Sequence, residues 1–305
     1  MLITEPDTGF EWQSPVITEK HALQCAKNTT SQNIDYLAVP WASIIDRLRT
    51  NSEEYKLQAI RAINNLKDLP KKRYTTVCQH YQFRSALNHM KDIGVTTLYT
   101  PHATQRDNGN DIDIRPFPLY ATITPSVLKR KALWYSFIGA YMDHYMSDIR
   151  LNIFNDTHPK NCVVVRRDKW QYNDDVYTSQ VWNQDIPEMQ RYLNLEKQKY
   201  YEYILSNSRF SLCPSGAGPN SIRLFESLSC GSIPVVLSDA LQLPQVKSVD
   251  WSECVITIPE DGYHDLRLIL KDIPLSRERD MSMNCVEAYK HVSDENFIEC
   301  IINTI

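Results

Sequence analysis

Short apolar runs alternate with longer amphipathic segments along the chain. Such runs, rich in Val, Ile, Leu and Tyr, predict buried strands, at residues 34–39, 74–78, 95–99, 133–138, 162–165, 210–213, 233–237 and 255–258. The segments between them predict helices at residues 41–49, 53–69, 83–93, 142–154, 186–205, 263–270 and 276–291. Alternating strands and helices are typical of a parallel sheet covered by helices. The pattern therefore predicts an α/β fold.

One helix has a well-defined periodicity. In residues 53–69 the apolar side chains of Leu57, Ile60, Ile63 and Leu66 recur at helical spacing. This spacing predicts that all four lie on one buried face.

A chain of 305 residues is long enough for two domains of about 150 residues each. Residues 112–120 contain two prolines and predict an extended segment or an edge strand. Residues 124–126, Thr-Pro-Ser, follow it and are expected to form the linker. The expected domains are therefore residues 1–125 and 126–305.

Glycines concentrate in one stretch of the second expected domain. The chain has 8 Gly in 305 residues, well below the usual frequency of about 7%. Gly216 and Gly218 fall between a strand and a helix that Asn220 or Ser221 can cap, and Gly231 ends this helix. A glycine loop before a helix lets the backbone approach a ligand closely and presents N–H groups to an anion.

Arg223 and Glu226 lie three positions apart, on one face of the first turns of that helix. There the arginine can hold a phosphate and the carboxylate can accept hydrogen bonds from ribose hydroxyls. The alternative is a tight turn followed by a surface Arg–Glu pair. Neither a Walker A loop nor a G-x-G-x-x-G fingerprint occurs in the sequence.

Composition limits the class of protein. The 33 basic and 37 acidic residues give a net charge of −4, which argues against a general nucleic-acid binder. Basic clusters at residues 71–73, 129–131 and 166–167 are expected to be solvated faces; the alternative is a surface for anionic lipid, with peripheral membrane association, or for a phosphate-bearing acceptor. The scattered cysteines, Cys78, Cys162 and Cys213 among them, predict buried reduced thiols. With no signal peptide and no long apolar span, a cytoplasmic location is expected.

Residues 213–239, CPSGAGPNSIRLFESLSCGSIPVVLSD, resemble the signature of the exostosin family, glycosyltransferase family 47. The shorter stretches YLAVPW, TVCQH and PFPLY resemble bacterial members. The resemblance implies a GT-B fold, in which two Rossmann-like domains with mainly parallel sheets face each other across a cleft. It also implies that a final helix packs back on the first domain.

The family's activity is the transfer of a sugar from a nucleotide donor with inversion. A UDP-sugar is the expected donor substrate, with no cofactor, and the acceptor is a glycan or lipid-linked saccharide in capsule or O-antigen synthesis. The resemblance places the donor against Gly139, Arg150, Ser215, Gly216, Gly218, Ser221, Arg223 and Glu226. Animal exostosins carry an arginine where this chain has Ser215. Many retaining GT-B enzymes have a glutamate at the position of Gly218, so its absence favours inversion.

Inverting transfer needs a base, expected on the first domain after a strand. His80 and His102 follow two predicted strands, and His80 is the preferred candidate because its strand resembles the most regular element of the family's N-terminal domain. Asp143 is a third candidate. Asp111 and Asp113 form a D-x-D triplet, but the signal is short, and transfer without a metal ion is predicted.

Two other functions remain open. The chain could be a catalytically silent exostosin-like scaffold subunit of a polymerase complex, and a homo- or heterodimer is compatible with either role. It could also be a nucleotide-sugar enzyme of another kind, although the dehydrogenase fingerprint is missing.

Overall fold

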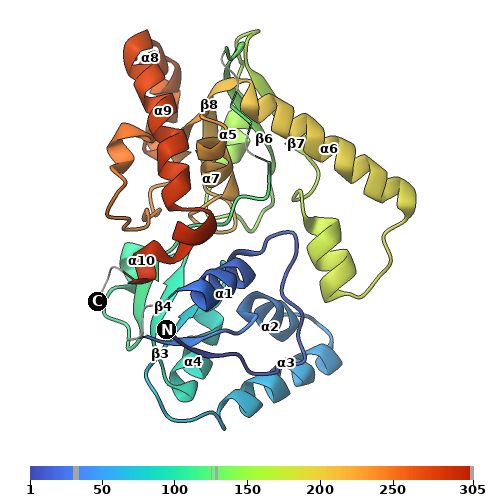
Figure 1. Ribbon diagram of the computed structural model, residues 1–305. Coiled ribbons are helices and arrows are strands. Elements are labelled where there is room, and N and C mark those ends of the chain that lie inside the picture. Colours follow the sequence, from blue (N-terminus) through green and yellow to red (C-terminus); the bar gives the residue numbers. More distant parts are fainter. Residues whose placement is uncertain (30–33, 125, 128–129, 303–305) are drawn as a thin grey trace.

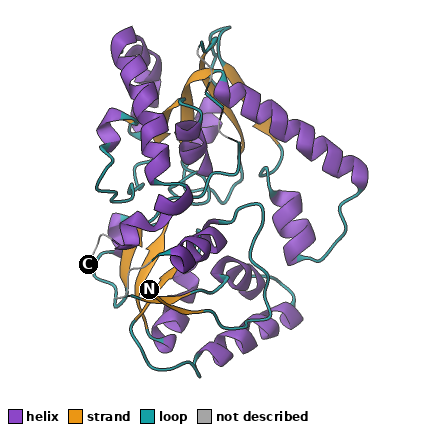
Figure 2. Ribbon diagram, viewed as in Figure 1, coloured by secondary structure: helices purple, strands orange, loops and turns teal. Residues whose placement is uncertain are grey.

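The structure is a computed structural model that describes residues 1–29, 34–124, 126–127 and 130–302. Its strands form two five-stranded sheets, in the orders β1-β2-β3-β4-β5 and β10-β9-β8-β6-β7. All the described strand pairs are parallel. In Figure 2 the strands lie inside each half of the molecule and helices surround them. The predicted GT-B arrangement of two parallel-sheet α/β domains is confirmed.

Each sheet belongs to one half of the sequence. The first contains β1 (Leu2–Thr4), β2 (Asp35–Leu37), β3 (Tyr74–Val77), β4 (Val95–Thr100) and β5 (Asp113–Pro116). The second contains β6 (Leu133–Ala140), β7 (Val163–Arg167), β8 (Ser208–Pro214), β9 (Ile233–Leu237) and β10 (Ile256–Thr257). The predicted edge position of β5 is confirmed. Pro125, at the centre of the expected linker, lies outside the described residues.

The helices of the first half are α1 (Thr18–Asn28), α2 (Trp41–Leu48), α3 (Glu53–Leu66) and α4 (Leu87–Ile93). Those that follow are α5 (Ile149–Asn155), α6 (Glu188–Ser206), α7 (Ile222–Ser229), α8 (Leu266–Asp272), α9 (Leu275–His291) and α10 (Glu299–Ile302). A π-helical segment, Asp174–Val181, precedes α6.

The helix predicted at residues 142–154 is wrong over its first half, because α5 begins only at Ile149. The preceding residues form a loop that is tied to the glycine segment. The backbone N–H of Met146 donates to the carbonyl of Gly216 over 2.9 Å. This tertiary hydrogen bond replaces the helical one that residue 146 would otherwise make.

The buried face of α3 differs from the predicted one. Ile63 and Leu66 are buried, but Leu57 and Ile60 are 51% and 42% exposed. Ala59 is fully buried instead. The face that packs against α2 is therefore rotated toward the small alanine, which lets the two helices approach closely.

The first sheet is covered differently on its two faces. Successive residues point to opposite sides, so Leu98 packs with α2, α3 and α4, whereas Tyr99 belongs to a core shared with the second domain. Residues 294–302 complete that shared core. Phe297 packs edge-on against Phe117 at 5.0 Å between ring centres, and the Cys25 thiol donates to the carbonyl of Asp294 over 2.9 Å. Figure 1 places α10 next to the first domain.

A second connection crosses between the domains. Residues 168–187, here called the strap, join β7 to α6 and pass beside α2 (Figure 1). The backbone of Ser14 donates to the amide of Gln180 over 3.1 Å, and this amide donates back to the Ser14 carbonyl over 2.6 Å. Arg47 donates to the Gln180 carbonyl over 3.0 Å. The strap is thereby fixed to the first domain.

All eight cysteines carry free thiols. Seven are buried, but Cys162 is only half-buried, since it precedes the edge strand β7. Across residues 1–302, apart from the short gaps, the structure contains no helix long and apolar enough to cross a membrane.

Candidate active site

A cavity of ≈ 330 Å³ lies between the two domains. The first domain lines it with residues of α2 and with the loops that follow β3 and β4. The second domain lines it with the end of β6, the strap, the glycine loop and α7. The loops thus come from the carboxyl ends of parallel strands, where α/β proteins bind their ligands.

Close packing explains the two glycines of the loop. A Cβ atom on Gly216 would lie 2.7 Å from Nη2 of Arg150, and one on Gly218 would overlap the His102 imidazole. Neither glycine has a positive φ. Both are needed because they lack a side chain, which lets Arg150 and His102 approach the loop closely. The second contact also joins the domains, because His102 belongs to the first.

Part of the predicted anion site is already occupied. The N–H of Ser215 donates to the carbonyl of Leu237, and that of Gly216 donates to the carbonyl of Gly218, both over 2.9 Å. The hydroxyl of Ser215 donates to Glu260 over 2.7 Å, outside the cavity. The expectation that the backbone of Ser215 and Gly216 binds phosphate is therefore wrong for this conformation. Ser221 does line the cavity, at the start of α7.

Arg150 hydrogen bonds to the backbone around the glycine loop and does not point its donors into the cavity. It lines the cavity, but its guanidinium donates to the carbonyls of Ser215 (2.7 Å), Ala140 (3.1 Å) and Pro214 (3.4 Å). Burial, and secondarily the charge of Arg223, lower its pKa to about 10. The donor contact expected of Arg150 is thus replaced by a structural role in holding the glycine loop.

Arg223 has unused hydrogen-bonding capacity. Its side chain is buried, and one terminal nitrogen donates to the carbonyl of Ile138 at the end of β6. Its Nε and Nη1 atoms are buried and have no partner among the described residues. Buried guanidinium donors without a partner are costly. An anion in the cavity would satisfy them.

Gly139 allows the approach of this arginine. It lies inside β6 and is paired with Arg166 of β7. A Cβ atom on Gly139 would lie 3.3 Å from Nη2 of Arg223. Its lack of a side chain therefore leaves room for the guanidinium at the cavity wall.

Glu226 is 1% exposed and accepts hydrogen bonds from three protein hydroxyls. They come from Tyr201 (2.5 Å), Thr122 (2.8 Å) and Tyr172 (3.4 Å). Burial raises the pKa of Glu226, and the hydroxyls and the Arg223 charge act against that shift. The carboxylate lines the cavity, but in this conformation protein hydroxyls take the place expected for the ribose.

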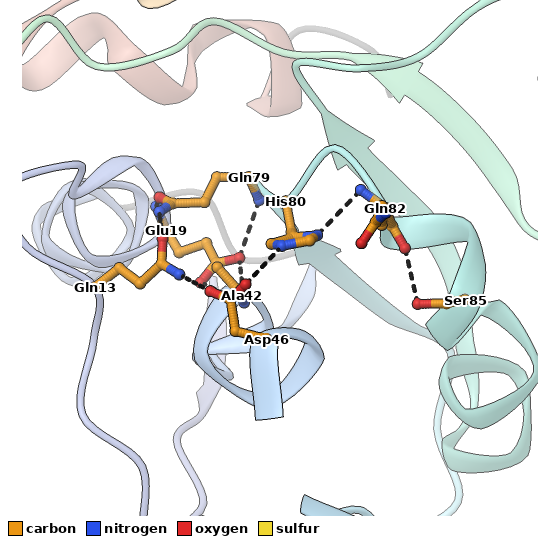
Figure 3. Close-up of polar contacts among 8 residues, drawn as sticks. All are labelled: Gln13, Glu19, Ala42, Asp46, Gln79, His80, Gln82 and Ser85. Carbon is orange, nitrogen blue, oxygen red and sulfur yellow. Dashed lines mark hydrogen bonds and ion pairs between the residues drawn. The ribbon is translucent and has the colours of Figure 1, made fainter. Parts of the chain in front are cut away.

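His80 has no free ring nitrogen. Its Nε2 lies 3.1 Å from Oδ1 of Asp46, and its Nδ1 accepts the backbone N–H of Gln82 over 3.0 Å (Figure 3). Because a backbone N–H can only donate, Nδ1 is the unprotonated nitrogen and Nε2 carries the proton to Asp46. The preference for His80 as the base is therefore not supported by its geometry.

His102 is neutral but enclosed. Burial lowers its pKa to about 3, and the positive charge of Arg84 acts in the same direction. Its Nδ1 is buried, lies against Gly218 and has no hydrogen-bond partner in the described chain. The predicted position in the cleft is correct, but the lone pair faces the glycine loop rather than open space.

Asp143 is exposed and does not line the cavity, although its neighbours Met142 and His144 do. Its selection as a base rested on its position just after Gly139, and that position does not bring it into the cavity. Asp111 and Asp113 are also outside the cavity, in surface ion pairs with Lys91 (2.5 Å) and Arg115 (2.6 Å).

Sequence reasoning missed the carboxylate that the first domain places in the cavity. Asp46, on α2, is 8% exposed and accepts hydrogen bonds from His80 and from Gln13. The available signal was an acidic residue within the apolar sequence WASIIDRL. The strap, whose Trp170 and Tyr177 line the cavity, carried no recognisable pattern either.

The cavity has a surplus of positive charge. Among the lining residues that the structure describes, the cations are Arg150, Arg167, Lys169 and Arg223, and the carboxylates are Asp46 and Glu226. Four positive against two negative groups favour an anionic ligand. Arg167 belongs to one of the basic clusters expected to be solvated.

Comparison with known proteins gives a consistent result. The sequence model of the Exostosin GT47 domain matches residues 74–273. A probable glucuronoxylan glucuronosyltransferase of Arabidopsis thaliana is 39% identical over 82 residues, covering 27% of this chain and 18% of the relative. Exostosin-1 of Drosophila melanogaster is 39% identical over 85 residues, covering 28% of this chain and 11% of the relative. The chain thus spans less than a fifth of the length of these relatives.

Among solved structures, the glycosyltransferase WaaG, involved in lipopolysaccharide biosynthesis, aligns over 100% of both chains. Its sequence identity is 10% and the TM-score is 0.46.

Proposed function

The chain belongs to the exostosin GT47 family, and from that premise we propose that it is a glycosyltransferase acting in the interdomain cavity. A nucleotide-sugar is the donor and a saccharide is the acceptor. The observation that carries the proposal is Arg223, whose two buried and unpartnered nitrogens suit a diphosphate. The surplus of positive charge around it supports the same ligand.

The finer proposal is a UDP-sugar donor, transfer with inversion, and no metal ion. Aromatic residues of the strap, Trp170 and Tyr172, line the cavity and can stack on a planar base. The guanidinium of Arg223 supplies positive charge for the departing diphosphate. Relatives named glucuronosyltransferases make UDP-glucuronic acid the first donor to test. Capsule or O-antigen synthesis stays part of the proposal. A cytoplasmic location is proposed with it, and the eight free thiols are compatible with a reducing compartment.

The test is titration of UDP and UDP-glucuronic acid into the wild type and Arg223→Ala by calorimetry. Loss of a charge-assisted contact should weaken UDP binding by about 2 kcal/mol or more, roughly thirtyfold. Arg277→Ala is the matched control, since that arginine pairs with Glu253 at the surface of the same domain. Equal UDP affinity in folded Arg223→Ala and wild type would contradict the assignment.

One observation favours a second candidate, a catalytically silent exostosin-like subunit. The hydrogen bonds to Glu226 from three protein hydroxyls occupy the carboxylate proposed for the donor ribose. Absence of binding by wild-type protein to UDP, GDP and their sugars would favour that role over catalysis.

A further inference from the structure

We propose that Asp46 is the general base that takes the proton from the acceptor hydroxyl, and that His80 and Gln13 hold it in position. The inference rests on the proposed glycosyl transfer and names a group for it. Asp46 lines the cavity from the first domain, opposite α7 and the glycine loop of the second.

Two directed hydrogen bonds fix the Asp46 carboxylate. Nε2 of His80 donates to Oδ1 over 3.1 Å, and Nε2 of Gln13 donates to Oδ2 over 2.5 Å. Each carboxylate oxygen has a further lone pair, so both can accept another hydrogen bond. Asp46 therefore keeps acceptor capacity for a substrate hydroxyl while its orientation is set.

Further hydrogen bonds orient His80 and Gln13, the two residues that donate to Asp46 (Figure 3). The N–H of Gln82 holds Nδ1 of His80 without its proton, which places the proton on the nitrogen facing Asp46. The side-chain amide of Gln79 donates to the side-chain Oε1 of Gln13 over 3.0 Å. The NH₂ group of the same Gln13 amide must therefore face Asp46. Such a supporting layer holds the Asp46 carboxylate in one orientation.

Four other titratable groups that line the cavity, His80, His102, Glu226 and Tyr81, are less suited. Both His80 nitrogens are engaged, and the free Nδ1 of His102 is closed off by Gly218. Glu226 lies on the donor side and accepts three hydroxyls. Burial raises the pKa of Tyr81, which makes its hydroxyl a donor rather than a base.

The step then balances. The acceptor O–H bond breaks and its proton moves to an Asp46 oxygen, while the oxygen lone pair forms the new bond to the anomeric carbon. The bond from that carbon to the diphosphate breaks, and its electron pair leaves on the diphosphate oxygen beside Arg223. The neutral carboxylic acid of Asp46 returns its proton to water after product release.

The experiment first identifies a usable donor by thermal shift with UDP-glucuronic acid, UDP-glucose, UDP-galactose and UDP-N-acetylglucosamine. Release of UDP from the stabilising donor, with water as the acceptor, is then measured for the wild type, Asp46→Asn and Asp46→Glu. UDP affinity by calorimetry reports that each variant is folded. Asp68→Asn, an exposed carboxylate of the same domain, is the control.

We expect Asp46→Asn to lower kcat by about a hundredfold or more, with UDP affinity within twofold of the wild type. Asp46→Glu should keep part of the rate, and its activity should still fall at acidic pH. The remaining activity of Asp46→Asn should not fall at acidic pH. His80→Gln tests positioning, and it should lower kcat about tenfold without removing that acidic limb.

Undiminished kcat in Asp46→Asn would overturn the inference while leaving the glycosyltransferase proposal intact. If the wild type binds none of the nucleotides, the glycosyltransferase proposal and this inference fail together. An acidic limb that persists in Asp46→Asn would also count against Asp46 as the proton acceptor.

Discussion

Gly218→Ala should destabilise the protein by forcing a side chain into the contact between the domains. In the structure a Cβ atom at residue 218 would overlap the His102 imidazole, its Nδ1 and Cε1 atoms above all. His102 is buried and cannot move to an exposed rotamer without leaving its pocket. Overpacking of this kind costs about 1–3 kcal/mol, which for a chain of this size is a fall in Tm of roughly 2–4 °C per kcal/mol.

Gly262→Ala is the matched control, because its nearest neighbour would be at 3.5 Å from the added methyl group. It should melt within a degree or two of the wild type. Removing the imidazole should relieve the overlap, so the double variant Gly218→Ala/His102→Ala should be more stable than the sum of the two single changes predicts.

The assays are urea unfolding and thermal melts, in one buffer, of the wild type, Gly218→Ala, His102→Ala, the double variant and Gly262→Ala. A Gly218→Ala protein as stable as Gly262→Ala would refute the steric argument. Simple additivity in the double variant would show that the two residues do not interact, and the close approach of the domains at this point would then be wrong.

Two further predictions concern the scaffold. Burial raises the pKa of Glu19 to about 8. The folded state therefore keeps a proton on Glu19 that the unfolded state loses above pH 4.5. The free energy of unfolding falls as pH rises from about 5 to 8, because the folded state must then lose that proton. Glu19→Gln should lack this dependence, and its urea midpoint relative to the wild type should rise across that range; a constant difference would contradict the shift. Phe297→Ala should cost about 3–5 kcal/mol of unfolding free energy because the ring is 1% exposed. Leu275→Ala, at 64% exposure, should cost little, and equal losses in thermal melts would disprove the packing role of Phe297.

Strong local signals made much of the fold predictable. The strands β8 and β9 are buried apolar runs, and α7 between them ends two residues before Gly231, whose φ is +60°. Where the signal depended on tertiary partners, prediction failed. Residues 142–148 have a helical pattern but hydrogen bond to the glycine loop, and α3 buries Ala59 in preference to Leu57.

The site divides in the same way. Arg223 and Glu226 could be found from their spacing beside the glycine loop, and both line the cavity. What they bind within the protein could not be predicted, because Thr122 and Tyr172 come from distant segments. The same holds for His80. One ring nitrogen accepts from nearby Gln82, but the other contacts Asp46, which is distant in the sequence.

The passage of residues 294–302 back onto the first domain has a consequence for synthesis. Cys25 and Asp294 are hydrogen bonded across 269 sequence positions, and Phe297, Ile298 and Ile301 share a core with Leu23 and Phe117. A ribosome makes the chain from its amino end, so residues 294–302 are synthesised long after the first sheet. One face of that sheet therefore cannot be covered until they have emerged. Until they emerge, this apolar face lacks its cover and is exposed to chaperones or to aggregation. The first domain therefore reaches its native packing late, after the second has been translated.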